Sequence, residues 1–215
     1  MLQLVATLIV ILIVIVSASS ANASIALSAE LTNANENPPT TPTTSGGAPR
    51  PASFGTATFL INDTQTAMTF TATVFNIDVT GSQTPDVNDN LVAAHIHAAA
   101  VVTPTINAPV VWGFFGMPFN DNNPNDFTMT AFATGVGGTF GGKWDALEGN
   151  NTTLAAQLPN ILSGNAYINF HTTQFGGGEI RGPLRLVPEP STMVLMASAV
   201  TGLLSYRWRR SRRKR

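Results

Sequence analysis

The 215-residue chain contains no cysteine, only three histidines and few charged residues, which make up 11% of it. The absence of cysteine excludes thiol catalysis and a disulfide framework. Basic residues are also scarce in residues 24–186, where 11 acidic side chains accompany 4 basic ones, a net charge of −7. An acidic body of this kind argues against nucleic acid as a partner.

The basic residues that are present gather at the C-terminus, where residues 187–215 carry 7 basic side chains and 1 acidic one. A Val-Pro-Glu-Pro-Ser stretch comes first, then an apolar run over residues 192–206, then an arginine-rich end. As a helix, the run spans about 22 Å, against a hydrocarbon core of about 30 Å. Flanking aromatic and arginine side chains favour a short transmembrane helix whose basic end stays in the cytoplasm.

This order of three features resembles the PEP-CTERM sorting signal of Gram-negative bacteria. The resemblance implies that an exosortase, a membrane protease-transpeptidase, recognises Pro188, Glu189 and Pro190. The enzyme would remove the tail and pass the protein from a membrane-anchored intermediate to the cell surface or extracellular matrix. Composition alone leaves an ordinary, permanent membrane anchor as the alternative.

The N-terminus has the features of an export signal. Residues 1–16 are apolar apart from Gln3 and Thr7, and Ala21-Asn-Ala23 offers small residues at the spacing that signal peptidase requires. We therefore predict a signal peptide over residues 1–23, with an uncleaved N-terminal anchor as the alternative.

The remaining residues, 24–186, are enough for one domain with a sizeable core. Apolar and polar residues alternate along several segments, and a helical spacing at 154–162 predicts a short helix that ends or kinks near Pro159. These patterns predict an all-β fold, an antiparallel β-sandwich (Ig-like or SOD-like) of about seven to eight strands with one short helix. The expected strands are 24–32, 53–61, 67–77, 91–98, 110–115, 127–134, 167–171 and 179–186.

Two motifs in this body resemble the chordin-type (CHRD) domain. Ala-His-Ile-His at 94–97 is followed about 70 residues later by Asn-Phe-His-Thr at 169–172 and by Gly-Gly-Glu-Ile-Arg-Gly-Pro-Leu at 177–184. The opening strand, with Leu-Ser-Ala-Glu-Leu-Thr at 27–32, is similar to the first strand of that family. The resemblance covers essentially all of residues 24–186 and implies a fold and an exported location rather than a reaction.

All three histidines fall in these motifs. His95 and His97 share one face of a strand because side chains alternate along it, and His171 lies on a second strand. Three imidazoles can hold zinc or copper, with Glu179 as a fourth ligand or as an acceptor that orients a ring. Alternatively, the histidines serve as structural hydrogen-bonding groups, or pair with Glu179 while Arg181 neutralises it.

Three other segments have compositions that also occur in calcium-binding or nucleotide-binding loops. Residues 86–90 and 121–126 are rich in Asp and Asn, but they lack the spacing of a calcium-binding EF-hand loop and are typical of solvated turns. Residues 135–142 are rich in glycine, but an acidic, exported sandwich is a poor place for a nucleotide-binding loop.

These observations predict an exported, non-enzymatic surface protein that binds an extracellular polysaccharide or an envelope protein. A metal-binding envelope protein or metalloenzyme that uses the three histidines is the alternative from a different class. A third alternative is a protein that stays tethered because its tail is never cut.

Overall fold

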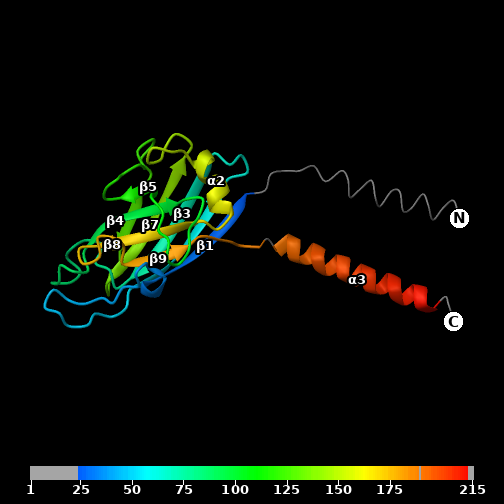
Figure 1. The fold of residues 1–215 in the computed structure, drawn as a ribbon, viewed down its shortest axis with the longest axis horizontal. Coiled ribbons are helices and arrows are strands. Elements are labelled where there is room, and N and C mark those ends of the chain that lie inside the picture. Colours follow the sequence, from blue (N-terminus) through cyan, green and yellow to red (C-terminus); the bar gives the residue numbers. More distant parts are fainter. Residues whose placement is uncertain (1–23, 189, 213–215) are drawn as a thin grey trace.

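The computed structural model describes residues 24–188 and 190–212, which form an antiparallel β body and a separate C-terminal helix (Figure 1). The predicted signal peptide and Glu189 lie outside the described residues. The strands are β1 (Ile25–Thr32), β2 (Phe54–Ile61), β3 (Ala67–Phe75), β4 (Leu91–Ala98), β5 (Val110–Phe115), β6 (Thr128–Ala131), β7 (Gly137–Asp145), β8 (Ala166–Thr172), β9 (Ile180–Pro183) and β10 (Arg185–Leu186). The helices are η1 (Asn33–Asn35), α2 (Leu154–Leu162) and α3 (Pro190–Arg212).

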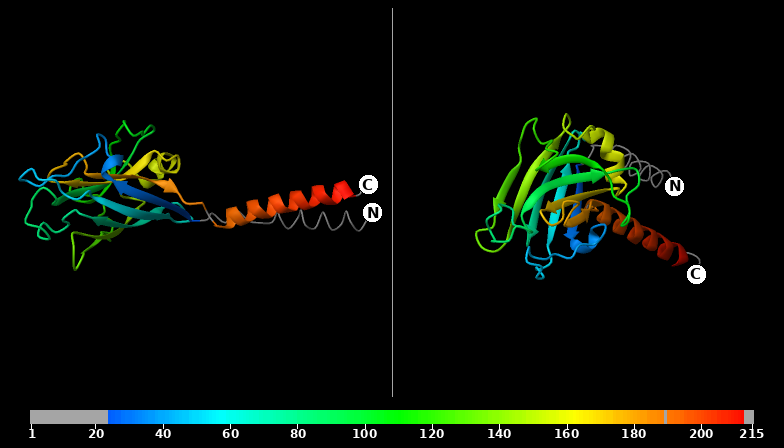
Figure 2. Two further views of the ribbon diagram at one scale, coloured as in Figure 1. Left: turned by 90° about the horizontal axis from the view of Figure 1, so that it is seen from below. Right: turned by 60° about the vertical axis from the view of Figure 1, so that its left-hand side comes forward.

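The ten strands form one sheet in the order β5-β4-β8-β9-β1-β2-β3-β7-β6, with β10 paired to β1. This sheet curls so that its two halves face each other across the core (Figure 2). Rings meet across the gap: Phe70 of β3 lies 4.5 Å from Phe114 of β5 between centroids, and Phe140 of β7 lies 5.1 Å from Phe170 of β8. The all-β, antiparallel prediction is confirmed, but a single continuous sheet replaces the two separate sheets of the expected sandwich.

Strict alternation explains the half of the sheet made by β1, β2 and β3. In β2, for example, every second residue is buried, and the outward positions between them are exposed. Burying one face of each strand supplies the core, while the outward face keeps its polar residues in water.

Two strands add to the expected number: β7, which lies in the glycine-rich segment left out of the expected strands, and β10, because the expected strand 179–186 is divided into β9 and β10. Glycine is required in β7 because the sheet is crowded. A Cβ on Gly138 would lie 2.7 Å from the carbonyl oxygen of Thr130, and one on Gly142 would lie 2.9 Å from an oxygen of Asp121. These glycines mark close backbone approach within a strand rather than a flexible loop.

Helix α2 covers the end of the body from which α3 leaves (Figure 1). The Thr153 side chain caps it by accepting a hydrogen bond from the Ala156 N–H, and its apolar face is buried. The predicted short helix is present over Leu154–Leu162 with Pro159 inside it, so of the two expected effects of the proline, an end or a kink, the helix does not end at Pro159.

The body ends at Val187, whose N–H donates to the carbonyl oxygen of Ala26. Pro188 is exposed, and α3 begins at Pro190. Among residues 24–188 and 190–212, no helix is both long and apolar enough to cross a membrane. The predicted tail helix is present as α3. The prediction that it spans a membrane is not supported, since its uncharged run of about 15 residues is followed by arginines.

Candidate functional site

The three histidines meet on the face of β4 and β8 that points away from the core. On β4, His95 and His97 alternate with the core residues Ala94 and Ile96. On β8, His171 pairs with Ala93 of the neighbouring strand, so its ring lies beside those of β4. The convergence expected of a three-histidine site is therefore present.

The rings are close enough to act together. His95 Nδ1 and His171 Nε2 are 3.2 Å apart, and one ligand atom from each of the three rings lies within 4.8 Å of the others. The rings are also buried, with exposed fractions of 4% for His95, 8% for His97 and 6% for His171.

Backbone carbonyls orient two of the three rings. His97 Nδ1 is 2.9 Å from the carbonyl oxygen of Ala108, and His171 Nδ1 is 3.1 Å from that of Gly176. In a neutral imidazole, Nδ1–H donates to such a carbonyl, and Nε2 is then left with a lone pair. The Nε2 atom of His97 is buried and has no hydrogen-bonding partner among the described residues.

Burial keeps all three rings neutral near pH 7. It lowers the pKa of His95 to about 4, with a smaller effect from the neighbouring His171. It lowers the pKa of His97 to about 3 and shifts that of His171 in the same direction. A neutral imidazole is the form that binds metal ions.

Shifts of register in the pairing of β4 with β5 help to orient the histidine side chains. The pairing of β4 with β5 shifts register at Ala94/His95 and at Ile96/His97. Gly113 of β5 pairs with His95, and a Cβ there would lie 1.8 Å from the carbonyl oxygen of Pro118 and 3.0 Å from the His95 ring. Bulges of this kind re-aim side chains next to functional sites.

Tyr167 and Arg181 lie beside the histidines. The His97 ring stacks on Tyr167 at 4.7 Å between centroids, and the guanidinium of Arg181 lies 3.6 Å from the centre of the same Tyr167 ring. Arg181 also donates to Asn107 and to the carbonyl of Thr103. Two-residue alternation from His171 back to Tyr167 was the sequence signal for this neighbour.

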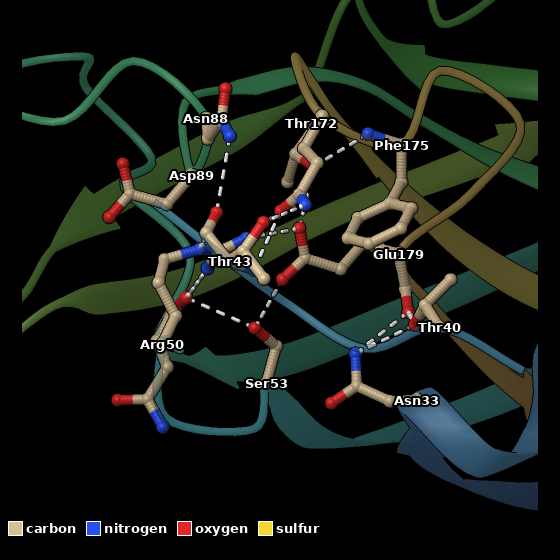
Figure 3. Close-up of polar contacts among 12 residues, drawn as sticks. Asn33, Thr40, Thr43, Arg50, Ser53, Asn88, Asp89, Thr172, Phe175 and Glu179 are labelled. Carbon is tan, nitrogen blue, oxygen red and sulfur yellow. Dashed lines mark hydrogen bonds and ion pairs between the residues drawn. The ribbon is translucent and has the colours of Figure 1, made fainter. Parts of the chain in front are cut away.

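Glu179 belongs to a different cluster, shown in Figure 3. Its carboxylate pairs with Arg50 at 2.8 Å and accepts hydrogen bonds from the hydroxyls of Ser53 and Thr172. Its backbone carbonyl accepts from Asn33 and Thr40. The expectation that Glu179 ligates a metal or orients a histidine ring is therefore wrong, and so is the alternative in which it pairs with a histidine while Arg181 neutralises it, because Arg50, Ser53 and Thr172 bind its oxygens.

The Asp-rich loop at 121–126 also contributes to a buried group. Asp121 is fully buried and accepts a hydrogen bond from the Asp126 N–H, while its second oxygen has no partner among the described residues. Lys143 bridges Asp126 and Asp145 with ion pairs of 3.0 and 3.1 Å. A lysine ammonium among these carboxylates competes with any cation, in keeping with the expectation of a turn rather than a calcium site.

Asp121 should make the stability of the protein depend on pH. Burial raises its pKa from 3.8 to about 6, so the folded state holds a proton that the unfolded state has lost between these values. The free energy of unfolding should therefore fall as pH rises from about 4 to about 6. We expect Asp121→Asn to flatten this slope and to stabilise the protein by about 1–2 kcal/mol at neutral pH.

Urea unfolding at a series of pH values measures this effect. The matched control is Asp63→Asn, which removes an exposed carboxylate from the turn between β2 and β3. An unchanged slope in Asp121→Asn would assign the pH dependence to another group.

Comparison with family models decides the identity of the body. The CHRD domain model matches residues 27–184, which is most of the chain and the whole sheet except its two outermost residues at each end. The chain belongs to the CHRD domain family.

A second model, the PEP-CTERM protein-sorting motif, matches residues 186–213 of this CHRD protein. Its match begins at the last residue of β10 and covers α3. The protein is therefore an exported one that an exosortase processes. No curated protein and no solved structure matches the chain.

Proposed function

We propose that this CHRD protein acts at the cell surface or in the extracellular matrix as a non-enzymatic module that binds a neutral polysaccharide. The outward face of β2, β3, β7 and β6 is the binding surface. The observation that carries the proposal is the pairing of threonines across these strands. One row aligns Thr56, Thr73, Thr139 and Thr130, and a second includes Thr58, Thr71 and Thr128.

These hydroxyls suit a sugar polymer, because each donates one hydrogen bond and accepts others without bringing a charge. Neighbouring rows lie two residues apart along the strands, and the opposed hydroxyls of Thr58 and Thr71 are only 2.9 Å apart. Two charged residues lie at the margins of the rows. Glu30 of β1 pairs with Thr56 at the end of the first row, and Lys143 of β7 pairs with Thr69, two residues along β3 from Thr71 of the second row.

An aromatic platform lies at one end of the same face. Phe54 and Phe75 stack at 4.8 Å with their planes 11° apart, and they are 48% and 37% exposed. Stacked phenylalanines in water cost free energy unless an apolar surface covers them, and the ring faces of sugars offer such a surface.

The paired substitution Phe54→Ser and Phe75→Ser should weaken polysaccharide binding by about tenfold or more, the value of about two aromatic contacts. Binding is measured by co-sedimentation with extracellular polysaccharide from the producing organism, using the full protein. Val87→Ser, which changes an equally exposed apolar residue in the loop before β4, serves as the control and should bind as the unaltered protein does.

Equal binding by the paired variant and the unaltered protein would refute the assignment of this face. Retention of a protein from the cell envelope, with no polysaccharide bound, would refute the assignment of the ligand.

A further inference from the structure

The spacing of the histidine nitrogens matches that of ligands on a single ion. Zinc lies about 2.0–2.1 Å from imidazole nitrogen, so two nitrogens in a tetrahedral site are about 3.3 Å apart. The separation between His95 Nδ1 and His171 Nε2 is 3.2 Å. The widest separation in the group, 4.8 Å, requires the third ring to move inward by roughly 1.5 Å to reach the same geometry.

The rings are also oriented in the way that metal ligands are. A ligating histidine generally donates its other ring N–H to a carbonyl or carboxylate, which fixes the tautomer. Ala108 and Gly176 supply these carbonyls for His97 and His171, so that Nε2 of each ring carries a lone pair, which in His171 faces Nδ1 of His95.

A purely structural role does not account for His97. A buried polar atom without a partner costs free energy, and most buried polar groups in proteins are satisfied. The Nε2 atoms of His97 and His95 are both buried without a partner among the described residues, and one ring nitrogen of His97 lies within 4.8 Å of ring nitrogens of the other two histidines.

We propose that His95, His97 and His171 bind one zinc or copper ion outside the cytoplasm. Three imidazole nitrogens without thiolate are a donor set that suits these two metals. His95 contributes Nδ1, and its proton moves to Nε2 of the same ring when the ion takes the place of the hydrogen bond to His171. Water completes the coordination shell.

This site is independent of the polysaccharide-binding face. It lies on β4 and β8, in the other half of the sheet from β2 and β3. Loss of metal and loss of polysaccharide binding can therefore be tested separately.

The test uses the full protein purified without a histidine tag, which matters because these are the only three histidines in the chain. After treatment with a chelator, separate samples receive Zn(II), Cu(II) or Cu(I), and bound metal is measured by mass spectrometry after dialysis. We expect one ion per chain, and the comparison of the three samples identifies the preferred metal.

The variants His97→Gln and His171→Gln should each weaken binding by on the order of 100-fold or more, since loss of even an orienting partner costs 10–100-fold. Asp126→Asn, in the acidic loop, should bind as the unaltered protein does. Electron paramagnetic resonance of the Cu(II) sample should show coupling to imidazole nitrogens, a readout that does not depend on whether the variants fold.

Substoichiometric metal in the unaltered protein would overturn the proposal. So would undiminished binding by a folded His171→Gln variant, or a Cu(II) spectrum with oxygen ligands alone.

Discussion

Replacing Glu179 with glutamine should lower the free energy of unfolding by about 3–5 kcal/mol, the usual cost of breaking a buried ion pair from one side. The side chain of Glu179 is fully buried, and that of its partner Arg50 is only 5% exposed. Glutamine keeps the shape, but its single oxygen can replace only one of the two carboxylate oxygens that accept from Ser53 and Thr172, and it leaves the guanidinium without a counter-charge. Urea unfolding of the variant measures the loss.

Two further variants separate the charge from the packing. Arg50→Met should also destabilise the protein, and the double variant should lose less than the sum of the two, because the pair is then removed together. Lys143→Met breaks ion pairs whose side chains are 22–32% exposed and should cost no more than about 1 kcal/mol. A loss below that level in Glu179→Gln would show that the buried pair does not hold the loop to the body.

The same network explains how the long segment between β1 and β2 stays in place. This segment has little regular structure beyond η1, yet Arg50 and Ser53 bind the carboxylate of Glu179, and Asn33 and Thr40 bind its backbone carbonyl. Loosening Glu179 should therefore release both ends of the segment at once (Figure 3).

Alternation along the chain predicted most of the sheet. β4 and β5 match the expected bounds of 91–98 and 110–115, and the hairpin of β2 and β3 forms around the turn at 62–66. These strands could be read from sequence because one face of each is buried, and burial imposes a period of two.

The sequence did not predict a strand where apolar and polar side chains do not alternate. In β7, glycines replace the side chains that would have shown an alternation, and their role is visible only once the neighbouring strands are in place. The curl of the sheet was also beyond prediction, because it depends on the long-range pairing of β9 with β1.

The candidate site was also predicted only in part. Shared motifs and two-residue spacing predicted that the three histidines gather, and the structure brings them together. Glu179 was assigned to the histidine site because it immediately precedes β9, the strand that pairs with β8 and its His171. Its carboxylate instead binds Arg50, 129 positions away in the sequence. Only the tertiary fold reveals a contact of that separation.

Replacing both Pro188 and Pro190 with alanine should abolish removal of the C-terminal helix. Pro188 is exposed and lies just beyond Val187, the last residue bonded to β1, so an exosortase can reach the motif without disturbing the sheet. Prolines restrict the backbone around Glu189 to extended conformations, and alanines would let α3 extend into the motif. Leu186→Ala, which changes an exposed residue two positions before Pro188, is the control and should be processed normally.

Processed and unprocessed forms of these variants are separated by the mass of the tail. The body should fold equally well in each, because Pro188 and Pro190 lie outside the strands and the side chain of Leu186, in the two-residue strand β10, is exposed. Normal trimming of the double alanine variant would show that the enzyme recognises another part of the tail.

The intact mass of the protein recovered from the outside of its own cells tests the central claim most directly. Among the described residues, β1 at the start of the body pairs with β10 at its end, and both predicted cleavage sites lie outside the strands, so neither cut removes part of the sheet. We predict a chain that starts at Ser24 and lacks the arginine-rich helix. An uncut chain of 215 residues, found only inside the cell, would contradict this account.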